Sequence, residues 1–88
     1  MNLSFWFFKQ VDLASEYQKI DFFHNANLTR LINILLVSDS DSEIQFSWDG
    51  TKLSGILKKK EILEISEVKR NKIYVKGFDS MRIWVSDP

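Results

Sequence analysis

Apolar residues recur at helical spacing in the first third of the chain. Over residues 12–24 they stand at Leu13, Tyr17 and Ile20, four and three positions apart, with charged and amide side chains between them. This spacing places the apolar side chains on one face of a helix. Asp12 is a suitable N-cap because its carboxylate can accept hydrogen bonds from the free N–H groups of the first turn. The pattern therefore predicts a helix over residues 12–24, ended by the polar run that follows it.

Two further apolar segments are less decisive. Residues 5–8 are all aromatic, which favours a short strand over an extended arm laid across the core. Residues 28–37 match the helical template at positions 28, 31, 32, 35 and 36, whereas positions 32, 34 and 36 also alternate as in a strand buried on both faces. We expect a helix from Leu28 to Ile32 or beyond, and a strand remains the alternative.

From residue 43 onward the period of the pattern changes to two. Ile44, Phe46 and Trp48 alternate with polar residues, and Asp49-Gly50 then supplies a turn whose backbone tolerates a positive φ. Four further apolar segments follow, separated by polar or charged turns. The five strands expected here are residues 44–48, 53–57, 62–68, 73–75 and 81–85.

These elements predict a mainly β protein of the α+β class. Five short antiparallel strands leave two open edges, and a sheet of this size commonly curls into a small barrel that a helix caps. We therefore expect a single small globular domain over residues 1–88. Its mainly helical N-terminal part, residues 1–37, contains one or two helices and precedes a five-stranded antiparallel meander or barrel over residues 43–86.

The residue types narrow the possible chemistry. The chain has no cysteine, which excludes disulfides, thiolate catalysis and cysteine-ligated metals. It has one histidine and three glycines, and it contains no Walker-type loop or Gly-x-Ser-x-Gly motif. His24 stands at the end of the first predicted helix, where the helix dipole favours a structural histidine. We therefore expect no enzymatic activity, no cofactor and no bound metal.

Asp39, Asp41 and Glu43 have the spacing that opens a calcium-binding loop. The sixth position of such a loop should be glycine and is Ile44, and the twelfth should be glutamate and is Gly50. We expect a solvated connecting loop here.

The chain shows no membrane or secretion signal that sequence patterns can identify. Its longest unbroken apolar runs have four residues, against the about 20 that a membrane-spanning helix needs. No lysine or arginine precedes the first apolar run, as one would in a secretory signal. We expect a cytoplasmic protein that has no membrane partner.

Charge is unevenly distributed, although twelve basic and twelve acidic side chains cancel. Residues 1–51 contain three basic and seven acidic side chains, whereas residues 52–76 contain eight basic and three acidic ones. If the lysine-rich turns of the second segment converged, they would form a basic rim able to bind phosphates. The alternative is that exposed lysines only keep the sheet edges soluble and unpaired. The candidate cations are Lys58, Lys59, Lys60, Lys69, Arg70, Lys72 and Lys76.

Aromatic residues are interleaved with this basic region and can stack on unpaired bases. Tyr74 and Trp84 are opposite in phase to the aliphatic residues beside them, so one or the other is the better candidate for an exposed ring. A ring exposed beside Arg70 would equally suit a protein-binding hot spot. Tyr74 and Trp84 complete the set of candidate binding residues.

Two short motifs resemble those of Sm and Lsm proteins. Residues 49–57 have the spacing of the end of the first Sm motif, and Val75-Lys76-Gly77 is similar to the Ile-Arg-Gly of the second. The resemblance implies a small RNA-binding barrel with an N-terminal helix, assembled as a ring of subunits. The family's Asp-x-x-Met-Asn loop is absent near residues 58–62, and Lys76 lacks the planar fork of the family's arginine. A uracil-selective ring pocket is therefore not implied.

The sequence supports two hypotheses about function. The first is a non-catalytic small-barrel module that binds RNA or a nucleoprotein through the basic turns. The alternative is a small inhibitor, immunity or adaptor protein that binds another protein through a sheet edge or through the acidic first half. A chain with oppositely charged parts is also suited to binding its own copies, so a homo-oligomer is a further possibility.

Overall fold

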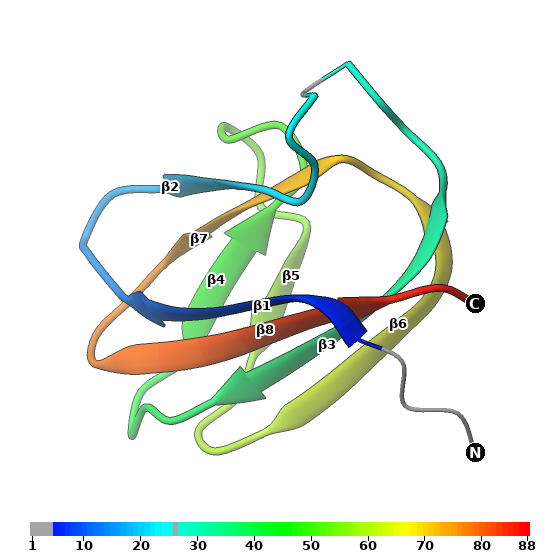
Figure 1. The fold of residues 1–88 in the computed structure, drawn as a ribbon. Helices are drawn as coiled ribbons and strands as arrows, with labels where there is room; N and C mark the ends of the chain where they lie inside the picture. Colours follow the sequence, from blue (N-terminus) through cyan, green and yellow to red (C-terminus); the bar gives the residue numbers. More distant parts are fainter. Residues whose placement is uncertain (1–4, 26) are drawn as a thin grey trace.

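Eight β-strands make up the regular structure of the described residues (Figure 1). The computed structural model describes residues 5–25 and 27–88, and no helix occurs among them. Within those ranges there is accordingly no helix long and apolar enough to cross a membrane. The strands are β1 (Phe5–Asp12), β2 (Gln18–Asp21), β3 (Leu31–Ser38), β4 (Ile44–Ser47), β5 (Gly55–Leu57), β6 (Ile62–Lys69), β7 (Lys72–Lys76) and β8 (Ser80–Ser86).

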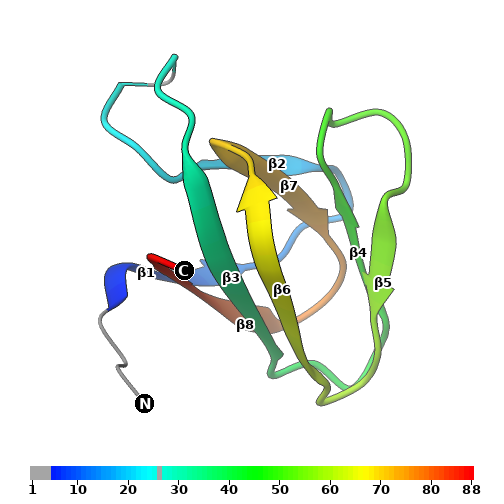
Figure 2. The ribbon, with the colours of Figure 1, turned by 90° about the vertical axis from the view of Figure 1, so that its right-hand side faces the viewer.

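The strands form two four-stranded antiparallel sheets (Figures 1 and 2). The first sheet has the order β1-β8-β3-β6, and the second has the order β2-β7-β4-β5. Only β4 and β5 are neighbours both along the chain and within a sheet. Every other connection between consecutive strands therefore crosses from one sheet to the other, and nearly all strand pairing is long-range.

The core lies between the two sheets and is built from alternate residues of the strands. Side chains of a strand point alternately to its two faces, so each strand contributes one row to the core and one row to the outer surface. Burying an aliphatic side chain contributes roughly 1.5–3 kcal/mol, which makes these inner rows the main source of stability. The fully buried residues of β3, β7 and β8 are Ile32, Ile34, Leu36, Ile73, Val75, Met81, Ile83 and Val85.

The helix predicted over residues 12–24 is absent, and that prediction is wrong. β1 continues to residue 12, β2 begins at residue 18, and the residues between them cross from the first sheet to the second. Two backbone hydrogen bonds tie this crossing to the turn between β7 and β8. The Leu13 N–H donates to the Asp79 carbonyl at 2.8 Å, and the Gly77 N–H donates to the Ala14 carbonyl at 2.9 Å.

The three apolar residues that suggested this helix lie in three different environments. Ile20 is buried, Leu13 packs at the margin of the core, and Tyr17 lies against the ammonium group of Lys76 on the outer surface. Helix propensities of ordinary residues differ by less than about 1 kcal/mol. Pairing of β1 with β8 and of β2 with β7 outweighs that local preference.

The segment that fitted both helix and strand is a strand over most of its length. The helix expected from Leu28 to Ile32 is wrong and the alternative is correct, as is the strand expected for residues 5–8. β3 is paired on both sides, with β8 and with β6, so its backbone groups are satisfied in a buried position. Ile34 points into the core, whereas Leu35 faces outward between Trp84 and Glu64.

The expected meander and barrel are wrong, although the five strands predicted after residue 43 are present as β4 to β8. β6, β7 and β8 pair with strands from the first half of the chain or with β4, and not with one another. The sheets stay open instead of closing into a barrel, and the described part of residues 1–37 holds three strands instead of helices. A period of two identifies a strand but does not specify its partner.

Gly55 of β5 lies directly under the ring of Phe46. A Cβ atom at position 55 would clash with Cζ of that buried ring. We therefore expect Gly55→Ala to lower the free energy of unfolding by about 1–3 kcal/mol, as measured by urea denaturation. Phe46→Leu removes the atom that clashes, so the same substitution should cost less in that background. An equal cost in both backgrounds would contradict this explanation.

Candidate functional site

The outer face of the second sheet is lined by lysine and tyrosine side chains. Lys72, Tyr74 and Lys76 alternate with the buried residues of β7 and therefore point away from the core. On the adjacent strand β2, Lys19 is the register partner of Tyr74. Tyr17 precedes β2 and lies against Lys76. We call the surface formed by these five residues the lysine–tyrosine face.

Contacts hold both tyrosine rings in position. The Lys76 ammonium lies 4.5 Å from the centroid of the Tyr17 ring, which is within cation–π distance. The Tyr74 ring packs against Gly50 in the loop between β4 and β5, where a Cβ atom would stand 2.9 Å from Tyr74 Cε2. Gly50 also has a φ of +85°, so glycine is favoured there both by backbone conformation and by space. The ring of Tyr74 is thus oriented before any partner arrives.

Positive charge dominates the lysine–tyrosine face. Asp21 carries a carboxylate at its edge and lies 3.9 Å from the Lys19 ammonium, with both side chains exposed; such surface pairs contribute about 0–1 kcal/mol. The two central strands of the sheet present no carboxylate outward. On this side of the sheet β4 has Gln45 and the fully buried Ser47, and β7 has Lys72, Tyr74 and Lys76.

The two lysine-rich turns lie at opposite ends of β6 (Figure 2). One turn, with Lys58, Lys59 and Lys60, leads from β5 into β6, and the other leads from β6 into β7. The eight residues of β6 separate them by roughly 25 Å of extended chain. The condition for a single basic rim, convergence of these turns, is therefore not met.

Lys60 forms a hydrogen bond and an ion pair with the loop between β3 and β4. Its ammonium donates a hydrogen bond to the Asp39 carbonyl at 2.8 Å and lies 3.7 Å from a carboxylate oxygen of Asp41. The acidic groups of this loop therefore offset part of the charge of the first lysine-rich turn.

Arg70 and Lys69 lie at the end of the sheets where β7 begins. The Arg70 guanidinium covers Trp48 at 4.9 Å from the ring centroid, and Trp48 packs edge-on against Phe46 at the margin of the core. Lys69 is the last residue of β6 in the first sheet. Both cations lie within three residues of Lys72 in sequence and add positive charge at this end of the molecule.

Trp84 points outward, as its phase predicted, but from the other sheet. Its ring lies 4.8 Å from Phe8 and 6.1 Å from Phe5, between centroids, and the Arg82 guanidinium lies 5.4 Å from it. Phe8 is 53% exposed. Of the two candidate rings, only Tyr74 therefore lies among the lysines.

The acidic segment of residues 39–43 is a connecting loop between β3 and β4, as expected. Asp39 accepts two hydrogen bonds from the Arg82 guanidinium, both at 2.9 Å, so its carboxylate is committed to a cation of the protein. No cluster of three or more histidine, aspartate or glutamate residues able to hold a metal ion is found in residues 5–25 and 27–88. His24 is exposed in the segment between β2 and β3, where no helix dipole acts on it.

Tyr17 and Lys19 belong to the lysine–tyrosine face but were not expected from the sequence. Both fell within the predicted helix, where their strand phase was hidden. Ile20 and Phe22 are buried, so an alternation of period two does run through residues 17–22. A strand of four residues offers too few positions for this signal to outweigh the helical spacing around it.

Asp49 organises the loop that supports Tyr74. One of its carboxylate oxygens accepts hydrogen bonds from the backbone N–H groups of Lys52 at 2.9 Å and Thr51 at 2.8 Å, and from the Ser47 hydroxyl at 3.0 Å. These bonds, led by the one from the Lys52 N–H, hold the pKa of Asp49 well below its ordinary value of 3.8. The charged carboxylate is therefore the form that the folded loop favours.

This lowered pKa makes the stability of the loop depend on pH. Its contribution is present above pH 3.8, the ordinary value, and is lost as the pH falls toward the lowered pKa of the folded state. We expect Asp49→Asn to lower the melting temperature at pH 7, and this difference from the unsubstituted protein to shrink below about pH 4. Thermal denaturation followed by circular dichroism measures both effects. Glu64→Gln, which removes an exposed carboxylate of β6, is the control, and an equal loss in that variant would refute the assignment.

Comparison of the chain with protein-family models, with curated proteins and with solved structures finds no match. The resemblance to Sm and Lsm proteins therefore stays a prediction from two short motifs, and a function must be argued from the residues of the chain itself.

Proposed function

We propose that the chain is a non-catalytic module that binds single-stranded RNA, alone or within a nucleoprotein, on the lysine–tyrosine face. One observation carries the proposal: Lys72 and Lys76 flank Tyr74 on the outer side of a central strand, beside Lys19 and Tyr17. Such a surface combines the two elements of sequence-tolerant single-strand binding, cations for the phosphates and aromatic rings for the bases.

The lysines supply affinity through the phosphate backbone. Each phosphate that a lysine neutralises releases condensed counterions, so binding is favoured by low salt. β4 and β7 carry no outward carboxylate. Asp21, the register partner of Lys72 on β2, offsets part of the attraction at the edge of the face.

Tyr74 supplies a surface on which an unpaired base can stack. Stacking of a base on an aromatic side chain contributes about 1–3 kcal/mol. Because Gly50 already supports the Tyr74 ring, little conformational entropy is lost when a base binds. An aromatic sheet surface suits unstacked bases, whereas the grooves of a duplex are usually read by an inserted helix or ribbon.

A protein-binding role is the second candidate, and a separate observation favours it. Phe5, Phe8 and Trp84 form a partly exposed aromatic group on the outer face of the first sheet. Exposed aromatic groups of this kind are common at the centres of protein interfaces. This candidate becomes the better one if the RNA titrations below give no binding.

Removal of single charges tests the proposed phosphate contacts. Fluorescence anisotropy with a labelled single-stranded RNA of about 12 nucleotides, repeated at several salt concentrations, gives the affinity and its salt slope. We expect Lys72→Gln and Lys76→Gln each to weaken binding and to lower the slope by about 0.7. Lys9→Gln, which removes a charge from β1 of the first sheet, should leave the slope unchanged.

Two results would overturn this proposal. The first is no change in anisotropy at low salt, and the second is binding without a salt slope. Either would favour the protein-binding candidate.

Substitution of Tyr74 separates stacking from charge. We expect Tyr74→Phe to retain RNA affinity and Tyr74→Leu to lower it by about tenfold, because leucine keeps an apolar contact with Gly50 but loses the aromatic surface. The salt slope should be the same in both variants, since no cation is removed. Equal affinities of the two variants for the RNA would show that the ring does not stack on a base.

A further inference from the structure

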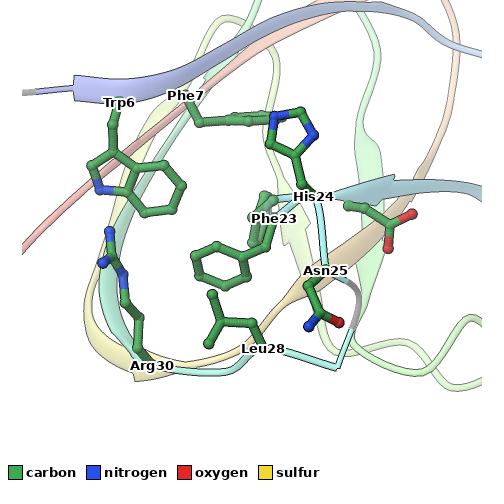
Figure 3. A pocket seen from close by; sticks show the side chains of 9 residues that line it. Trp6, Phe7, Phe23, His24, Asn25, Leu28 and Arg30 are labelled. Atoms are coloured by element: carbon green, nitrogen blue, oxygen red, sulfur yellow. The ribbon is translucent and has the colours of Figure 1, made fainter.

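A pocket of about 500 Å³ lies between β1 and the segment that connects β2 to β3 (Figure 3). Its volume falls within the range of small-molecule sites. It borders the lysine–tyrosine face at Asp21, but the residues proposed below to contact a ligand lie outside that face. The side chains that define it are Trp6, Phe7, Phe23, His24, Leu28 and Arg30.

A β-bulge makes the pocket aromatic. Phe5 is opposite Ser86 and Phe7 is opposite Val85, so Trp6 is an extra residue in β1 without a register partner. A bulge of this kind changes the direction of a side chain, and Trp6 and Phe7 line the same pocket although they are adjacent in sequence. Trp6 stacks on Phe23 with centroids 5.2 Å apart.

One hydrogen-bond donor at a wall of the pocket lacks an acceptor. The indole Nε1 of Trp6 is buried and has no hydrogen-bond partner among the described residues. The Arg30 guanidinium lies 4.8 Å from the centroid of the same ring, and Figure 3 shows the indole nitrogen on the side of the ring that faces it. A buried N–H without a partner is unfavourable by about 1–3 kcal/mol. A ligand that brings an acceptor oxygen to this wall would relieve that penalty.

The protein already places a carboxylate on this guanidinium. Arg30 Nη2 and Asp87 Oδ1 are 3.0 Å apart, and the two side chains are 48% and 63% exposed. A pair this exposed contributes little, so it can open. A ligand carboxylate that takes the place of Asp87 on this guanidinium would stand on the side of the ring that carries the indole N–H and could accept hydrogen bonds from both groups.

We propose that this pocket binds a small planar aromatic carboxylate. Its ring system lies against Phe7, Phe23 and Leu28, and its carboxylate replaces Asp87 on Arg30 and accepts a hydrogen bond from the Trp6 indole. Arg30 suits this exchange because its planar fork binds carboxylates in two-point geometry. The carboxylate that lines the pocket, Asp21, lies 3.9 Å from Lys19, so its charge is partly offset.

The test uses 2-naphthoate as the probe and its neutral methyl ester as the matched control. Titrations of the ¹⁵N-labelled protein are followed by the indole N–H signal of Trp6, which is assigned from its loss in Trp6→Phe. We expect 2-naphthoate to shift this signal in the direction of a stronger hydrogen bond, and the ester to bind about tenfold more weakly, because it lacks the charge that Arg30 attracts.

Substitutions of two exposed side chains, Arg30 and Asp87, should change the affinity for 2-naphthoate in opposite directions. Arg30→Gln removes the guanidinium and should weaken binding about tenfold, whereas Asp87→Asn removes the competing carboxylate and should strengthen it several-fold. Neither variant should alter the affinity for the ester. Equal binding of acid and ester, weaker binding in Asp87→Asn, or no shift of the Trp6 signal at millimolar probe would overturn the proposal. The RNA titrations use other variants and another ligand. Failure of the carboxylate proposal would therefore leave the RNA proposal standing, and the reverse also holds.

Discussion

The position of β8 between β1 and β3 is the constraint on which the rest of the fold depends. This pairing brings the first and last strands into one sheet and buries Met81, Ile83 and Val85 completely. β2 and β7 pair in the opposite sheet, so the chain crosses between the sheets before and after each of them. The hydrogen bonds between Leu13 and Asp79 and between Gly77 and Ala14 join two of these crossings.

Repeated crossing between sheets separates residues that are close in sequence. Tyr74 and Trp84 are ten positions apart, and each points outward by the same alternation, yet they lie on the outer faces of different sheets. One outer face therefore combines tyrosine with lysine, and the other combines tryptophan with phenylalanine. The zero net charge of the chain conceals this difference, because it sums over both faces.

Local patterns predicted those parts of the fold that local chemistry decides. The strands after residue 43, the positive φ of Gly50 and the outward direction of Tyr74 and Trp84 all follow from a period of two and from turn residues. The helix predicted over residues 12–24 is wrong because its three apolar residues do not share one face. Ile20 lies in the core, Leu13 at its margin and Tyr17 on the outer surface. Tyr17 and Lys19 were missed for the same reason. The pocket at Trp6 depends on a bulge, whose position is set by the register of β1 against β8.

The sequence by itself determined that the chain is rich in short strands, that it lacks the residues of thiolate chemistry, and that its cations gather in the second half. These properties follow from residue type and from spacing along the chain. Only the tertiary structure decided which cations lie together: Lys72 and Lys76 of β7 join Lys19 of β2, while Lys58 to Lys60 lie at the opposite end of β6 from Arg70. Strand partners are chosen by the burial of whole inner faces, and that choice depends on residues far apart in the chain.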